Sequence, residues 1–294
     1  MKIKLLLMAL AMLAVNAAQA AVRPNMVVEG VQMPAWVERA SGARDALLPG
    51  AALNNKDRIV TGPGARARLR LADGSVIKLG ENGILALDDL GQKKSRVTDL
   101  VTASLDVVSG AFRFTTDALY KYRGERDVKV RIVTITVGIR GTDLWGKAEA
   151  TRDIVCLIEG KITVARDQEA FTMDQPMSFY IAPKGKPAEP VSPVPKEQLE
   201  KWALETEIAP GTGVARRDGK WRVYLADAGN QGDALRLYDQ LRNAGYAAEI
   251  RPLSSAKGID YQLRISHLAS KEEAAVLAGK LKGKMGITEP KVSR

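Results

Sequence analysis

The chain has 294 residues, with 44 Lys and Arg, 34 Asp and Glu, one histidine and one cysteine. A formal charge of +10 favours anionic partners, while the single cysteine allows no internal disulfide. The single histidine excludes a multi-histidine metal site and argues against a Ser-His-Asp or Cys-His catalytic site. We therefore expect neither a metal nor another cofactor.

The N-terminal residues predict an export signal. Two lysines precede a short apolar run over 5–15, and residues 18–20 read Ala-Gln-Ala, a small-x-small cleavage pattern. The run is shorter than the roughly 20 apolar residues that span a membrane. We expect cleavage after Ala20 and a periplasmic mature chain without a membrane span. An exported protein rarely meets genomic DNA, so anionic wall polymers or lipid head groups are the favoured partners and nucleic acid is not expected.

Residues 21–182 predict an all-β domain. Short apolar or alternating segments are separated by turn pairs such as Asn82-Gly83, Ser109-Gly110 and Glu159-Gly160. This spacing indicates a sandwich, a barrel or a solenoid-like β domain. The expected strands cover 26–31, 35–39, 57–60, 65–71, 75–79, 84–87, 105–109, 111–115, 128–134, 135–137, 143–147, 154–158, 161–166 and 177–181.

One alternating segment of this region predicts a hairpin with a basic outer face. Arg66, Arg68 and Arg70 alternate with apolar residues, so one face is buried and the other is wet. Asp73-Gly74 follows and predicts a two-residue type I′ turn, in which both residues have positive φ. A solvated sheet face accounts for the three arginines, and a binding role is the alternative that the sequence leaves open.

Two further motifs have structural interpretations. Cys156 lies in an apolar, strand-like run, which favours a buried structural thiol over a reactive thiol or an intermolecular disulfide. The glycine-rich segment 138–143 lacks the Gly-Lys-Ser/Thr of a phosphate loop, and no helix pattern follows it. We expect a tight turn there.

No carboxylates show the spacing of a glycoside hydrolase. Asp88 and Asp89 are sequence neighbours, which would point opposite ways on a strand. Asp73 and Asp143 lie at predicted turns, where aspartate commonly bonds its own backbone. We therefore expect that the protein is not an enzyme.

A linker is predicted over 183–218. Five prolines over 183–195 indicate an extended, semi-rigid spacer. Residues 196–207 predict a short helix that docks on a domain through Trp202 or stays partly frayed. Residues 210–219 predict a second, flexible link.

From residue 219 onwards the pattern predicts a strand-helix-strand-strand-helix-strand order. The first helix covers 231–244 and ends at Gly245, and Ser270 with Glu273 forms a capping-box signature for the second helix. A loop is expected over 252–258. The order βαββαβ predicts an α+β, ferredoxin-like domain over 219–294, with two helices on one face of an antiparallel sheet and the other face free.

The β-rich region resembles the FecR-type periplasmic domain. The stretches that carry the resemblance are LLPGAALNNKDRIVTGPGARARLRLADGSVIKLGENGILAL, SLDVVSGAFRF, ITVGIRGTDLWG and CLIEGKITV. The family is known best from iron-uptake signalling, where the protein also has a membrane span and a cytoplasmic part that acts on a sigma factor. Neither feature is recognisable in this chain, so the resemblance implies the all-β fold and the location rather than the signalling role.

Residues 219–294 resemble the SPOR domain, which binds peptidoglycan glycan strands stripped of their stem peptides. KWRVYLADAGNQGDALRLYDQLRNAGYAAEI and DYQLRISHLASKEEAAVLAGKLKGKMGI carry the resemblance. It implies that glycan lies on the sheet face away from the helices, where rings stack on sugars and arginines bond their polar groups. Glutamine often stands at the position of Tyr224 in this family, and serine at that of Asp227. The candidate glycan-binding residues are Arg222, Tyr224, Asp227, Glu249, Arg251, Gln262 and Arg264.

The sequence thus predicts a non-catalytic envelope protein. Its SPOR-like domain would bind denuded glycan, typically at the division septum, and its FecR-like domain would be presented to an unidentified envelope protein. The alternative is a regulatory or scaffold protein that acts by protein–protein contact through the β domain, with weak or no glycan binding. An ordinary polar sheet face is the corresponding alternative for the seven candidate residues.

Overall fold

The computed structural model describes residues 24–93, 100–117, 125–255 and 258–294, and the predicted export signal lies outside them. Most of the N-terminal region belongs to two β-sheets, here called sheet A and sheet B. Sheet A contains β1 (Met26–Gln32), β4 (Ala52–Leu53), β6 (Arg66–Leu71), β7 (Val76–Leu79), β12 (Asp143–Ala148), β13 (Arg152–Glu159), β16 (Ser178–Pro183) and β17 (Ser192–Pro193). Sheet B contains β2 (Ala35–Glu38), β3 (Arg44–Ala46), β5 (Arg58–Thr61), β8 (Ile84–Lys93), β10 (Glu125–Ile132), β11 (Ile135–Ile139), β14 (Ile162–Arg166) and β15 (Glu169–Met173).

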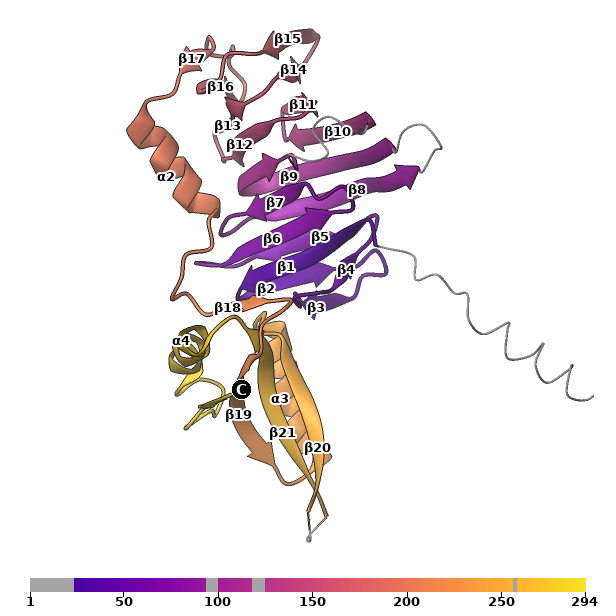
Figure 1. Cartoon of the computed structure of the whole chain (residues 1–294), viewed down its shortest axis with the longest axis vertical. Coiled ribbons are helices and arrows are strands. Elements are labelled where there is room, and N and C mark those ends of the chain that lie inside the picture. Colours follow the sequence, from indigo (N-terminus) through magenta and orange to yellow (C-terminus); the bar gives the residue numbers. More distant parts are fainter. Residues whose placement is uncertain (1–23, 94–99, 118–124, 256–257) are drawn as a thin grey trace, which may run out of the picture.

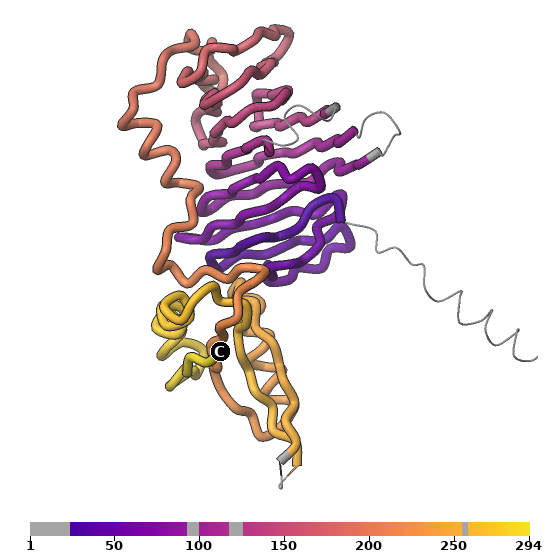
Figure 2. Tube along the Cα trace, viewed as in Figure 1, coloured from indigo at the N-terminus to yellow at the C-terminus, as the bar shows by residue number. Residues whose placement is uncertain are grey.

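The two sheets enclose one apolar core. Strand alternation points Leu69 and Phe112 inward from sheet A, and Leu85 and Val130 inward from sheet B, and all four are fully buried or nearly so. The strands stack along the long axis of the molecule, from β1–β5 near the C-terminal region to β15 at the far end (Figures 1 and 2). The all-β prediction for this region is confirmed.

Strand β9 (Leu100–Thr115) belongs to both sheets and corrects the prediction of two strands separated by a turn. Its first part pairs with β8 and β10 in sheet B, and its last residues pair with β7 and β12 in sheet A. Gly110 lies at the crossing with φ +81, and a Cβ there would lie 2.6 Å from the Cα of Gly83. Glycine therefore bends one continuous strand rather than ending it.

The basic hairpin forms as β6 and β7, but its turn differs from the predicted type I′ turn. The Leu71 amide donates to the Ser75 carbonyl oxygen at 2.9 Å, so the loop contains three residues, 72–74, rather than two, and only Gly74 of the predicted pair has positive φ. Asp73 accepts a hydrogen bond from the Ser75 amide at 2.9 Å, and Arg126 lies 3.0 Å from the same carboxylate. The aspartate side chain stabilises the longer turn, with glycine as the single left-handed residue.

Helix α2 (Lys196–Thr206) lies on the outer face of sheet A, which confirms docking through Trp202. The Trp202 ring stacks on Trp145 with 4.6 Å between ring centroids and packs edge-on against Phe179. Cys156 is fully buried in the same cluster, and burial raises the pKa of its thiol to about 12. This small second core supports the interpretation of Cys156 as a structural residue.

The expectation of a flexible link over 210–219 is wrong, because it contains strand β18 (Val214–Arg216). This strand pairs with β1 along three residues and with β21 through Ala215 and Leu268, so hydrogen bonding continues from the β region into the C-terminal region. The link is held by Glu273, whose carboxylate accepts from the amides of Gly213 at 2.6 Å and Val214 at 3.0 Å. A strand of three residues is too short to show an alternating sequence pattern, so its pairing with distant strands could not be predicted.

The C-terminal region begins with β19 (Trp221–Ala228) and continues through α3 (Gln231–Asn243), β20 (Ala248–Ser255), β21 (Gly258–Leu268), α4 (Lys271–Leu281) and β22 (Lys291–Ser293). Its sheet has the order β22–β19–β21–β20, and neighbouring strands are antiparallel. Strands β20 and β21 extend into the segment 252–258 that was predicted as a loop, and only residues 256–257 of it lie outside the described residues.

The helices of this region pack on one face of the sheet. Ala234 of α3 and Leu277 of α4 join one core with Val223 and Ile265 of the strands. Ser270 caps α4 by accepting from the Glu273 amide, as predicted. The reciprocal half of the capping box is absent among the described contacts, since the Glu273 side chain bonds the β18 segment instead. No helix among the described residues is long and apolar enough to cross a membrane.

Candidate glycan-binding face

Strand register brings the seven candidate residues to one face of the C-terminal sheet. Glu249, Arg264 and Tyr224 lie opposite one another across β20, β21 and β19. Cross-strand partners share a face, and so do residues two apart along a strand. A second row therefore contains Arg251, Gln262 and Asp227, and Arg222 lies two residues before Tyr224.

This face is opposite the one that the helices cover. The intervening residues Val223, Leu263 and Ile265 are fully buried in the core that α3 and α4 complete. The seven candidates are instead half-buried or exposed, with Asp227 and Arg251 the exposed members. The face is therefore polar and accessible, which suits an extended ligand with many hydroxyl groups.

Several of the candidates bond one another. The Arg264 Nε donates to Glu249 at 3.1 Å, and the Ser266 hydroxyl donates to the same carboxylate oxygen at 3.1 Å. Burial, together with a hydrogen bond to the Asp227 carboxylate, raises the pKa of Tyr224 to about 12. The phenol is therefore protonated at neutral pH and donates its hydrogen bond to Asp227.

A shallow hollow of about 230 Å³ lies at the end of this face that is nearer to β18. Arg222, Glu249 and Arg264 line it, whereas Gln262 and Arg251 lie in the next row and do not. Residues that the sequence reasoning missed also line it, namely Lys220, Trp221, Ser266 and His267. His267 has φ +67 and a buried Nδ1 that has no hydrogen-bond partner in the described structure.

The sequence reasoning missed Ser266 and also Lys291, which lies outside the hollow, for different reasons. Ser266 follows the same alternation as Gln262 and Arg264, so the period of the strand contained its signal. Lys291 faces Tyr224 from β22, but that strand has three residues and no periodic pattern. The described residues include no group of three or more His, Cys, Asp or Glu that could hold a metal ion.

Two family models match the chain, one described as FecR protein over residues 57–163 and one as SPOR domain over residues 218–292. The chain carries a FecR region followed by a SPOR domain. The recognition made from the sequence motifs is thereby confirmed, in the predicted order. Neither match is to an enzyme family, and both families are typical of envelope proteins.

The solved structures to which the chain is similar include two crystal structures, each described as a candidate anti-sigma factor from Parabacteroides distasonis ATCC 8503. The first is 16% identical with a TM-score of 0.39 and covers 76% of this chain and 89% of that chain. The second is 14% identical with a TM-score of 0.38 and covers 69% of this chain and 96% of that chain. No curated protein matches the chain.

Proposed function

We propose that this is a non-catalytic cell-envelope protein that binds denuded peptidoglycan glycan strands through its SPOR domain. The observation that carries the proposal is the SPOR match over 218–292, which covers the sheet whose helix-free face bears the seven candidate residues. In this proposal a signal peptide over 1–20 exports the chain, a FecR-like domain occupies 21–182 and a linker occupies 183–218. The SPOR domain over 219–294 follows the ferredoxin-like plan and takes the protein to sites of exposed glycan such as the septum.

The chemistry of the face supports binding of a sugar polymer. Tyr224 offers an aromatic ring for stacking and a protonated hydroxyl, and Arg264 is held in place by Glu249. Arg222 offers a guanidinium beside the hollow to hydroxyl or acetamido oxygens. A shallow hollow rather than a deep pocket lets a flexible chain lie across several strands.

The test is co-sedimentation of the mature chain, residues 21–294, with sacculi that are either intact or treated with an amidase that removes stem peptides. We expect preferential pelleting with treated sacculi. Loss of one stacking or charged contact costs about 1–1.5 kcal/mol, so Tyr224→Ala and Arg264→Ala should each weaken binding about tenfold. Arg236→Ala on α3 is the matched control, because Arg236 pairs with Asp233 on the helical side.

One observation favours a second function, regulation or scaffolding through the FecR region with weak or no glycan binding. Glu249 and Arg264 already satisfy each other, so two of the seven candidates need no ligand. If the folded mature chain fails to pellet with either kind of sacculus, the glycan proposal is wrong and this second function replaces it. The intact chain is preferred to an isolated fragment from residue 218, which would lack the backbone partners of Glu273.

A further inference from the structure

A row of basic side chains crosses the outer face of sheet A. The strand register places Arg113 opposite Lys78, Lys78 opposite Arg68, Arg68 opposite Gly30, and Gly30 opposite Arg216. Because cross-strand partners share a face, the four cations point to the same side of the sheet. Two of them come from the basic hairpin, whose role the sequence left open, and Arg216 comes from β18.

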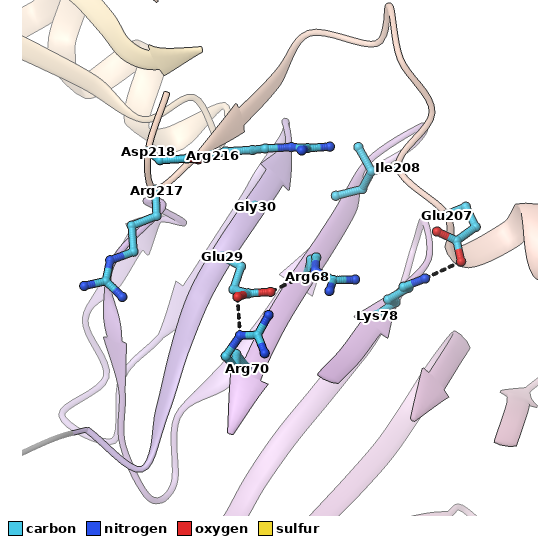
Figure 3. Close-up of a pocket in the computed structure, with 10 residues that line it drawn as sticks. All are labelled: Glu29, Gly30, Arg68, Arg70, Lys78, Glu207, Ile208, Arg216, Arg217 and Asp218. Carbon is cyan, nitrogen blue, oxygen red and sulfur yellow. Dashed lines mark hydrogen bonds and ion pairs between the residues drawn. The ribbon is translucent and has the colours of Figure 1, made fainter. Parts of the chain in front are cut away.

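A cavity of about 570 Å³ lies over the part of this row from Lys78 to Arg216, between the sheet and the segment that links α2 to β18 (Figure 3). We call it the junction cavity. Figure 3 shows Glu29, Arg68 and Arg70 grouped on the strands, with Arg216 and Ile208 on the opposite rim. The lining residues are Glu29, Gly30, Arg68, Arg70, Lys78, Glu207, Ile208, Arg216, Arg217 and Asp218.

The cations of the cavity are only partly neutralised. Glu29 pairs with Arg68 at 2.8 Å and with Arg70, and Glu207 pairs with Lys78. Burial raises the pKa of Glu29, but hydrogen bonds from Arg70 and Arg68 outweigh it and hold this pKa below its ordinary value. The ion pairs formed within the described residues involve Arg68, Arg70 and Lys78 of this cavity, but not the guanidinium groups of Arg216 and Arg217.

Gly30 leaves the floor of the cavity open between Arg68 and Arg216. A Cβ at this position would meet its nearest neighbours at 3.5 Å from the Ala215 carbonyl oxygen and 3.7 Å from Arg216 Cγ, which are ordinary van der Waals distances. Its backbone is outside the left-handed region, so the conformation does not require glycine. The absence of a side chain instead leaves open space between Arg68 and Arg216, whose strands are two apart, about 10 Å.

We propose that the junction cavity binds a ligand with two or more oxyanion groups, phosphate or carboxylate, which spans Gly30 from Arg68 to Arg216. Guanidinium groups bind such oxyanions through paired N–H donors, and the spacing of the row suits two anionic groups rather than one. Glu29 competes with the ligand for Arg68 and Arg70. Because β18 contributes Arg216, the bound ligand contacts both the FecR region and the strand that leads to the SPOR domain.

The test is isothermal titration of the mature chain with inorganic tripolyphosphate and, separately, citrate, at constant ionic strength. We expect saturable binding of one equivalent. Arg216→Gln should weaken it about tenfold, since it removes one charge-assisted contact. Gly30→Val should weaken it by a similar factor without changing the charge, because its side chain fills the floor. Glu29→Gln should strengthen it by freeing Arg68 and Arg70.

Arg140→Gln is the matched control, since Arg140 is exposed and has no ion pair in the described structure. It should leave the titration unchanged, and thermal melts should show that each variant is folded. The proposal is wrong if neither anion binds, or if folded Arg216→Gln and Gly30→Val bind as the unaltered chain does. These titrations contain no peptidoglycan, so they succeed or fail independently of the glycan proposal.

A second arm identifies the source of the oxyanion. The mature chain is floated with vesicles of phosphatidylglycerol or of phosphatidylcholine, with and without tripolyphosphate. Flotation with phosphatidylglycerol alone, abolished by tripolyphosphate and by Gly30→Val, supports the site with a lipid head group as its ligand. Tripolyphosphate binding without flotation supports the site with a soluble ligand.

Discussion

The outer face of sheet A has two ends that differ in composition and in what covers them. At one end Trp145, Cys156 and Phe179 continue the cross-strand row, and α2 covers them through Trp202. At the other end the row contains Lys78, Arg68 and Gly30, and it lies under a cavity instead of a helix. One face of a sheet can therefore form a packed layer at one end and a binding surface at the other. The composition of the row, rather than the strands themselves, separates the two ends.

Among the substitutions at the two ends of this face, removal of the Trp202 ring should change the free energy of unfolding most. Trp202→Ala deletes the stacking partner of Trp145 from a packed cluster, so we expect a loss of about 3–5 kcal/mol in the free energy of unfolding. Chemical denaturation measures it. Leu204→Ala on the same helix is the control, because Leu204 is 69% exposed and should change stability by less than about 0.5 kcal/mol.

The same variant should change the reactivity of Cys156. In the unaltered chain the thiol is buried and protonated at pH 8, with its pKa raised by burial to about 12, so iodoacetamide should label it only after denaturation. Faster labelling of Trp202→Ala would show that α2 has left the sheet. Equal stability of Trp202→Ala and Leu204→Ala would contradict the packed-layer interpretation.

Loss of the Glu273 charge should have the next largest effect, because it loosens the strand that bounds the junction cavity. The carboxylate accepts from the amides of Gly211, Gly213 and Val214, and Glu273→Gln leaves part of this set unpaired. We expect a loss of about 1–3 kcal/mol. Glu289→Gln is the control at an exposed site, and denaturation curves that superimpose for the two variants would refute the role of Glu273 in holding β18.

Acidification should remove the stability that the Glu29 ion pairs contribute at the basic end of the face. The pKa of Glu29 is lowered in the folded chain, because hydrogen bonds from Arg70 and Arg68 outweigh the effect of burial. The ion pairs therefore contribute stability that is full above the unfolded pKa, near 4.5, and is lost as pH falls through the lower folded value. Melting temperatures between pH 7 and pH 3 should show a difference between the unaltered chain and Glu29→Gln that shrinks below about pH 4.5. A difference independent of pH would rule out this contribution.

Gly30→Ala should have the smallest effect on stability. It tests whether the floor of the junction cavity is open or already packed. Alanine fits at ordinary contact distances and restricts the unfolded chain, so we expect a gain of about 0.5 kcal/mol. Thermal denaturation measures it. A clear loss of stability would show that the floor of the cavity is already packed.

Local periodicity was enough to predict many features of the molecule. The two-residue period placed the three hairpin arginines on an outer face, and it placed Arg222, Tyr224 and Arg264 together on one face of the last sheet. The apolar side of a short helix predicted docking through Trp202. These features depend on residues that are close in the chain, where side-chain direction follows from strand or helix geometry.

The tertiary structure decided the features that depend on distant segments. It made β9 one strand shared by two sheets, paired β18 with β1, and turned the Glu273 side chain toward that link. It also set Gly30 between Arg68 and Arg216, which lie far apart in the sequence. Strand register between remote segments comes from the whole packed core, so no local pattern records which residues will face one another.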